Sequence, residues 1–307
     1  MTGGRRIQIF LKSQKGSTTV IIVCVTMIII LASALLADIG YASVVHFKLK
    51  RNAESVAKEG AKLLVDSRER ALSYMKSSSV KKEYDLNALD IRISNNNREV
   101  TVTMGKPFRY IFLSFLGYGS KQIKTSVTVK LSCVGSYKYT RPFAVEKHNI
   151  VFGKSIILSD RPELRLDTAR FHVIDTGTGS LKTNIIYGNG KSFKAGEKVK
   201  LLKSYSISRM EEGLQSIVGK CSHQPLCTFD RYVNGCSRIL VLPVIGGESD
   251  KSGNMFAISG FTAFFIEDYD IIGGFADIKG KFIKYTVKSN AYDGAEDYGL
   301  LGVRIVN

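Results

Sequence analysis

An uncharged apolar run near the N-terminus constrains this chain more than any other feature. The run extends from Ser17 to Ala37, and Asp38 closes it. An α-helix rises about 1.5 Å per residue, so about 20 residues cross a hydrocarbon core of about 30 Å. The sequence therefore predicts one transmembrane helix at residues 17–37, preceded by a basic tail at residues 1–16.

A cleavable secretory signal is the alternative interpretation of this run. Ala32-Ser33-Ala34 fits the small-residue rule for a cleavage site, and the run has a basic start. However, the run is longer than the apolar core of about 7–15 residues that is usual in a signal peptide. The residues after Ala34 also favour a helix, whereas cleavage needs an extended segment. We therefore favour a retained anchor, and N-terminal sequencing of the mature protein separates the two readings.

Charge does not fix the orientation of this helix, because basic residues flank both of its ends. Long domains are translocated largely regardless of charge. We expect a single-pass protein of the cell membrane, with the short N-terminal tail in the cytoplasm and the large C-terminal part outside.

The net charge of +17 raises the question of an anionic partner. The basic residues are scattered and form no dense tract, which favours a solvated basic surface over a specific nucleic-acid site. Hydrophobic residues make up 44% of the chain, so the part beyond the apolar run is expected to fold in water. The lipid bilayer is the first expected partner.

A helical pattern continues beyond the apolar run. Apolar or small residues recur every three to four positions from Tyr41 to Met75, and Ser77-Ser78-Ser79 ends the pattern. This predicts an amphipathic stalk helix at residues 38–78, continuous with the anchor. Its face at Val56, Gly60 and Leu64 is the expected docking surface for a partner helix.

The remaining sequence predicts an α+β protein with two further parts. Residues 86–140 combine an alternating hairpin (89–93 and 100–104), a short aromatic helix that starts at Pro107 and ends at Gly117, and an alternating strand at 123–131. From Arg141-Pro142 onward, short apolar runs are separated by Gly and Asn turns. This predicts a β-rich domain at residues 141–307.

The order of these elements resembles TadE/TadG-like proteins of Flp (Tad-type) pilus assembly. The resemblance rests on the basic tail, the apolar run and the segment ADIGYASVVHFKLKRNAESVAKEGAKLL, within residues 12–75. A looser likeness to the pseudopilin-like pattern of strand, aromatic segment and strand extends to residue 140. The resemblance implies a small pseudopilin-like α/β module and a membrane-anchored role among pilin-like proteins.

Two motifs of that family are not matched. Processed pilins carry Glu five residues after the cleaved Gly, whereas Ile21 stands in that position after Gly16. The absent Glu favours a fixed anchor over a subunit that is cut after Gly16. Some relatives carry a metal site of the form Asp-x-Ser-x-Ser, but the segment from Asp175 to Ser180 has Gly in place of both Ser ligands. That metal site is not expected here.

Five cysteines leave several interpretations open. Cys24 lies in the apolar run, where a thiol is a small apolar group. Four others allow disulfides in the soluble part, with three connectivities; they are Cys133, Cys221, Cys227 and Cys236. Together with His223, the last three also form a four-ligand zinc set, although their spacing matches no compact zinc module. We favour a disulfide within this loop, and free thiols or a metal remain alternatives.

Other polar motifs favour structural roles. Asp175-Thr176-Gly177 resembles one half of an aspartic-protease site, but a second copy is needed and the tripeptide is also an ordinary turn. Glu267, Asp268 and Asp270 follow an apolar run, where they form a solvated loop or hold calcium. The sequence shows no nucleophile–base pair, so no catalytic, cofactor or metal residue is assigned.

The sequence thus favours a non-enzymatic component of a Tad/Flp-type pilus assembly system. It would act by protein–protein interaction through its helix and its β domain, with no small-molecule substrate. A membrane-tethered or secreted extracellular hydrolase with a β-rich catalytic domain is the alternative.

Overall fold

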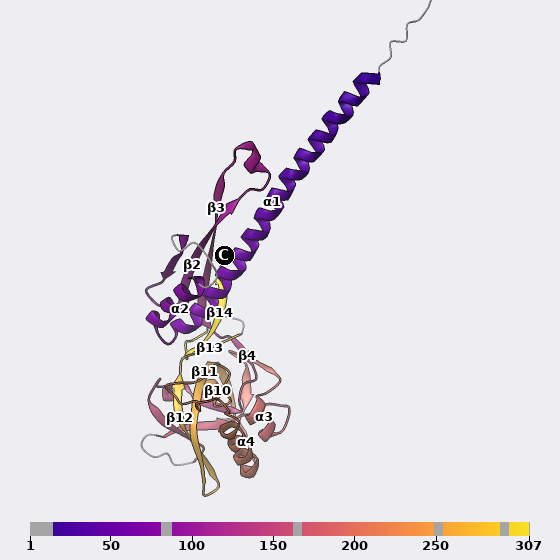
Figure 1. Cartoon of the computed structure of the whole chain (residues 1–307). Coiled ribbons are helices and arrows are strands. Elements are labelled where there is room, and N and C mark those ends of the chain that lie inside the picture. Colours follow the sequence, from indigo (N-terminus) through magenta and orange to yellow (C-terminus); the bar gives the residue numbers. More distant parts are fainter. Residues whose placement is uncertain (1–14, 81–87, 162–167, 249–253, 289–294, 307) are drawn as a thin grey trace, which may run out of the picture.

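A computed structural model describes residues 15–80, 88–161, 168–248, 254–288 and 295–306. The predicted basic tail falls mostly outside this part, as do the first two residues of the predicted 86–140 module. The fold is α+β, as the sequence predicts: one long helix projects from a β-rich body (Figure 1).

The helices of the described part are α1 (Lys15–Leu64), α2 (Arg68–Val80), α3 (Leu181–Tyr187) and α4 (Ile207–Gly219), with short 3₁₀ helices η2 (Leu113–Leu116) and η3 (Lys147–Asn149). The strands are β1 (Asp90–Ile93), β2 (Glu99–Arg109), β3 (Ser120–Cys133), β4 (Ser136–Lys138), β5 (Phe143–Glu146), β6 (Ser155–Ser159), β7 (Thr168–Val173), β8 (Ser192–Lys194), β9 (Lys198–Lys200), β10 (Ile239–Glu248), β11 (Met255–Ile272), β12 (Phe275–Ile283), β13 (Tyr285–Val287) and β14 (Leu300–Val306).

The predicted stalk helix is two helices, not one. α1 ends at Leu64, and the Ser67 hydroxyl accepts a hydrogen bond from the N–H of Arg70 at the start of α2. The chain folds back there. The close approach of the two helices shows this, since a Cβ built on Gly60 would lie 2.3 Å from Sδ of Met75. In one straight helix these two residues would be about 22 Å apart. The apolar stripe to Met75 is therefore real, but it closes a core instead of lengthening a stalk.

The predicted docking surface on this stripe lies inside the protein. Val56 is 2% exposed and Leu64 is 4% exposed, and both belong to the core between α1, α2 and the first sheet. That sheet has the order β1-β2-β3-β14-β13. The stripe packs against the chain's own sheet and not against a partner, because the fold-back brings α2 and the sheet onto it.

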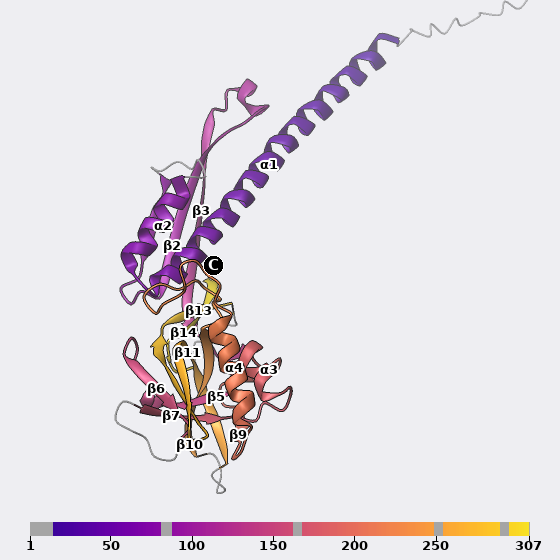
Figure 2. The same ribbon diagram turned by 60° about the horizontal axis from the view of Figure 1, so that its bottom comes forward.

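The hairpin that the period-two pattern predicts is confirmed. β1 and β2 are antiparallel, with Ile93 opposite Val100. The aromatic segment after Pro107 differs from the prediction, because β2 continues to Arg109 and only η2 is helical. Gly117, with φ of +85°, ends η2 as expected. β2 and β3 thus form a long hairpin that lies beside α1 (Figures 1 and 2).

The end of the described chain returns to the first sheet. β14 pairs with β3 in antiparallel register, with Leu301 opposite Cys133, and β13 pairs with β14. The expected division at Arg141-Pro142 therefore separates two sequence segments but not two complete domains. A second unit, which runs from β4 to β12 (residues 136–283), is inserted in the chain between β3 and β13. The first sheet is completed by strands that precede and follow this inserted unit.

The inserted unit is built on a seven-stranded sheet, with β9 at the edge beside β11, and six of its strands form a closed ring. β10 pairs with both β5 and β11, so the order β5-β7-β6-β12-β11-β10 closes on itself. The middle of β11 is buried on both faces: the neighbours Phe264 and Phe265 are both 0% exposed and belong to different cores. α3 and α4 lie side by side on this unit (Figure 2) and complete one of the cores with Ile185 and Leu214. The prediction of a β-rich C-terminal part is confirmed.

Candidate functional site

The N-terminal half of α1 presents apolar side chains to its surroundings. It contains a window of mean hydropathy 3.0 of which nothing is buried inside the protein. Ser17 and Ala37 both lie within α1, so the predicted span is one uninterrupted helix. This helix is long and apolar enough to cross a membrane, although a signal sequence has the same properties.

Asp38 joins this helix to the tip of the β2–β3 hairpin. Its side chain is 0% exposed, and its carboxylate accepts hydrogen bonds from the backbone N–H groups of Ile111 (2.8 Å), Phe112 (3.0 Å) and Leu113 (2.7 Å). Burial acts to raise the pKa of Asp38, but these three donors more than offset it, so the pKa lies below its ordinary value. The ionised carboxylate therefore fixes the tip against α1.

An apolar groove lies between the helix and this tip. It has a volume of about 580 Å³. Every residue that lines it is apolar: Ile28, Ile30, Leu31, Ala32, Ala34, Leu35, Phe112, Leu113, Phe115 and Leu116. Phe115 is 86% exposed and Leu116 is 64% exposed. A contiguous apolar surface of this kind marks a site of interaction with a protein or a membrane.

Aromatic and basic residues border the groove on the side of the body. The rings of Tyr41 and Phe108 are 5.3 Å apart, and Phe108 contacts Tyr110 edge to face. The last rungs of the hairpin also carry exposed basic side chains, at Lys106, Arg109, Lys121 and Lys124. Aromatic rings and basic groups at such a border are typical of the interface between a hydrocarbon core and water.

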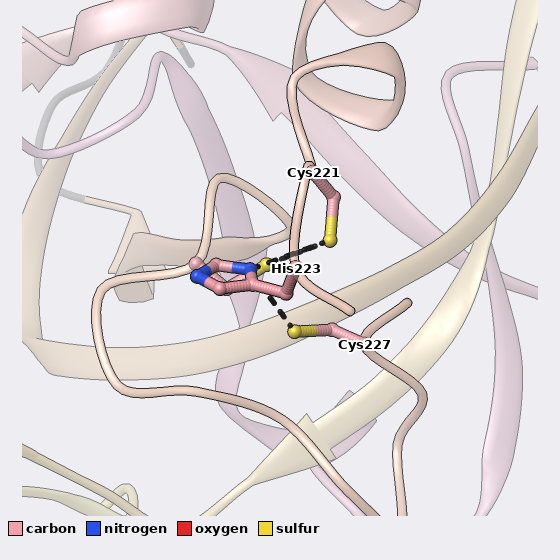
Figure 3. A group of neighbouring side chains, drawn as sticks. Cys221, His223 and Cys227 are labelled. Carbon is pink, nitrogen blue, oxygen red and sulfur yellow. Dashed lines mark hydrogen bonds between the residues drawn. The ribbon is translucent and has the colours of Figure 1, made fainter. Parts of the chain in front are cut away.

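A second polar cluster lies in the loop between α4 and β10. Nδ1 of His223 lies 3.6 Å from Sγ of Cys221 and 3.4 Å from Sγ of Cys227 (Figure 3). Sγ of Cys236 lies 3.6 Å from Sγ of Cys221. The ligand atoms of all four residues lie within 4.8 Å of one another, and the three cysteines are buried. The structure thus gathers the four residues that the sequence proposes as a zinc set.

The thiols of this cluster differ in their acidity. Burial acts to raise the pKa of Cys221, but hydrogen bonds with the His223 side chain and with backbone N–H groups lower it below the ordinary value. Burial raises the pKa of Cys236. These surroundings therefore favour the thiolate at Cys221 and the neutral thiol at Cys236.

The remaining cysteines lie elsewhere. All five are free thiols in the structure, so the disulfide interpretation stays a prediction. Cys24 is exposed on α1, as an apolar membrane-facing residue would be. Cys133 ends β3, where Arg98 Nη1 lies 3.8 Å from its sulfur, and it takes no part in the cluster.

The other candidate residues have structural surroundings. Asp175 accepts a hydrogen bond from the N–H of Gly177 at 2.9 Å, and Gly177 has φ of +71°, which confirms the predicted turn. The predicted loop at Glu267, Asp268 and Asp270 is wrong. All three lie within β11, because this strand pairs with β12 as far as Ile272. Asp268 and Asp270 are exposed on that strand.

Sequence reasoning missed the groove at the hairpin tip. The sequence did contain a signal: the mostly apolar segment IFLSFLGY lies between Arg109 and Lys121. The missing information was that β2 and β3 are long enough to carry this segment back along α1 to Asp38.

Comparisons with protein-family models, with curated proteins and with solved structures find no match to this chain.

Proposed function

We propose that this protein is a single-pass component of the cell membrane that is anchored by α1 and by the tip of the β2–β3 hairpin. Its body acts outside the cytoplasm by protein–protein interaction. The observation that carries the proposal is the apolar groove between α1 and the tip, held by the buried carboxylate of Asp38.

The depth of the groove supports a lipid occupant. Its α1 residues, from Ile28 to Leu35, stand three to ten residues before Asp38, which corresponds to about 4–15 Å along a helix. If Asp38 lies at the membrane surface, the tip reaches into the outer half of a core of about 30 Å. Acyl chains would then fill the groove, and the exposed basic side chains of the β2–β3 hairpin would contact anionic headgroups.

The specific system is proposed from the sequence resemblance. The likeness of residues 12–75 to TadE/TadG-like proteins supports a place in a Tad/Flp-type pilus assembly system. The burial of Val56 and Leu64 moves the expected contact with pilin-like proteins away from this stripe. The part of α1 between Asp38 and Lys48 is an exposed helical surface that could take this contact, and it carries Val44 and Phe47.

The anchor can be tested by fluorescence, since the chain has no tryptophan. The full chain with Phe115→Trp is reconstituted into vesicles that contain anionic lipid. We expect a blue-shifted emission that lipids brominated on their acyl chains quench. The matched control is Ile272→Trp, because Ile272 is 52% exposed at the far end of β11. It should be quenched by aqueous iodide and not by brominated lipid. Quenching of the Phe115→Trp emission by iodide alone would refute insertion of the tip.

Orientation and the pilus system need separate measurements. Protease treatment of intact cells should degrade the body beyond residue 80, and its protection would refute an extracytoplasmic location. Deletion of the gene should abolish surface pili, and the full chain should restore them. Normal pili in the deletion strain would refute the pilus assignment and leave the membrane anchor standing.

A further inference from the structure

We propose that Cys221, His223, Cys227 and Cys236 form a structural zinc site. The inference rests on the positions of four ligand atoms and is independent of the membrane anchor and of the pilus system.

Three of the six distances between ligand atoms match a tetrahedral zinc complex, and all six are within 4.8 Å. Zinc lies about 2.3 Å from a thiolate sulfur and about 2.0–2.1 Å from an imidazole nitrogen. A tetrahedron with these bond lengths has edges of about 3.8 Å between two sulfurs and about 3.5–3.6 Å between sulfur and nitrogen. The observed separations are 3.6 Å for Cys221–Cys236 and 3.6 Å and 3.4 Å from His223 to Cys221 and Cys227.

The donor set also points to zinc. Three thiolates and one imidazole make a soft site with four protein ligands, which suits Zn²⁺ and disfavours Ca²⁺ and Mg²⁺. The cysteine side chains are 3–6% exposed. Four protein ligands would leave no open position for water or substrate, so the ion would stabilise the fold and not catalyse a reaction.

The local structure explains what such an ion would hold. From Lys220 to Arg238, 19 residues connect the end of α4 to the start of β10. Loops longer than about 12–15 residues without regular structure are uncommon in compact domains. The four ligands span this loop, from Cys221 near α4 to Cys236 near β10. One ion would fix both ends of the loop against the core that contains Ile239 and Phe265.

A disulfide accounts for the cluster less well. The sulfurs of Cys221 and Cys236 are 3.6 Å apart, whereas a disulfide bond is about 2.05 Å long. The cluster holds three cysteines, so any one disulfide leaves a third buried thiol beside His223. Zinc would use all three sulfurs and the imidazole, and the three separations of 3.4–3.6 Å are close to those of a zinc complex.

The test measures metal in the full chain, purified in detergent with an affinity tag that contains no histidine. Elemental analysis should give about one zinc ion per chain. Cys227→Ser and His223→Ala should lower the zinc content at least several-fold. Cys133→Ser and Cys24→Ser are the matched controls, and they should retain the zinc of the wild type.

Since a structural site contributes to folding, the cluster variants can unfold, and a second measurement on the wild type avoids this difficulty. The full chain, stripped by a chelator under reducing conditions, is mixed with Co²⁺. We expect the visible d–d bands and the sulfur-to-cobalt charge-transfer band of a tetrahedral thiolate complex. Absence of these bands would overturn the proposal. Detection of a disulfide within the cluster of the isolated, zinc-free chain would also overturn it.

Discussion

The fold-back between α1 and α2 can be tested at the contact of Gly60 with Met75. Met75 is 0% exposed, and a Cβ on Gly60 would lie 2.3 Å from its sulfur and 2.5 Å from its Cγ. Gly60→Ala therefore forces two buried groups apart. Overpacking of a well-packed core costs about 1–3 kcal/mol. Alanine also has a higher helix propensity than glycine. This gain does not affect the docking of α2, because α1 is helical both when α2 is docked and when it is not.

The assay is amide hydrogen exchange of α2 in the full chain. A loss of about 1–3 kcal/mol should speed the exchange of α2 about 5- to 150-fold, since each 1.4 kcal/mol is a factor of ten. Gly40→Ala is the matched control on the same helix, because a Cβ at Gly40 meets nothing within 4 Å. It should leave the exchange of α2 unchanged.

A double variant shows whether the contact itself is responsible. Met75→Ala alone should cost about 2–5 kcal/mol, because it leaves a cavity. In that background, the methyl group of Gly60→Ala enters free space, so the two costs should sum to about 1–3 kcal/mol more than the double variant loses. An undiminished effect of Gly60→Ala in the Met75→Ala background would refute the contact. So would unchanged exchange in Gly60→Ala, as a straight helix to Met75 would give.

Three further predictions concern the inserted unit. Gly188→Ala should lower the melting temperature sharply, because Gly188 has φ of +78° and its Cβ would lie 2.1 Å from the carbonyl oxygen of Tyr139, whereas Gly190→Ala, with nothing within 4 Å, should have little effect. Phe264→Ala should lower the free energy of unfolding in urea by about 3–5 kcal/mol, because this ring is 0% exposed, and a loss below 1 kcal/mol would contradict its place in the core. Burial raises the pKa of Asp160 above 3.8; its protonated form is thus favoured by folding, and the stability that it contributes is present below about pH 3.8 and is lost as the pH rises through the folded-state value. Across this range, the melting temperature of the wild type should therefore fall relative to that of Asp160→Asn as the pH rises, and a constant difference would contradict the prediction.

Features that depend on neighbouring residues were readable from the sequence. The apolar run from Ser17 to Ala37 predicts a continuous helix, because the length and composition of a single segment decide whether it can cross a membrane. The alternation of apolar and polar residues before and after the turn at Asn97 predicts the hairpin, since a period of two places one face of each strand on a core. The turn at Asp175 follows from the hydrogen bond that Asp offers to its own backbone.

Features that depend on distant residues were not readable. The apolar stripe from Tyr41 to Met75 keeps the same helical spacing before and after Ser67. Periodicity therefore cannot distinguish one long helix from two helices that pack together. The sequence of the strand at Leu300–Val306 does not indicate that it pairs with β3, because pairing between distant strands leaves no local sequence signal. The hydropathy of the hairpin tip was visible, but its contact with Asp38 was not.

Residue type and spacing predict a long apolar helix, a β-rich remainder and a loop that contains three cysteines and a histidine. Which of these parts come into contact is known only from the folded chain. The tertiary structure folds α2 onto α1, returns β14 to the first sheet and places the hairpin tip beside the apolar helix. It also brings the sulfurs of Cys221 and Cys236, which stand 15 residues apart in the chain, to 3.6 Å. Burial and hydrogen bonding between distant segments set these contacts, whereas local residue type and spacing set only the helices and strands that make them.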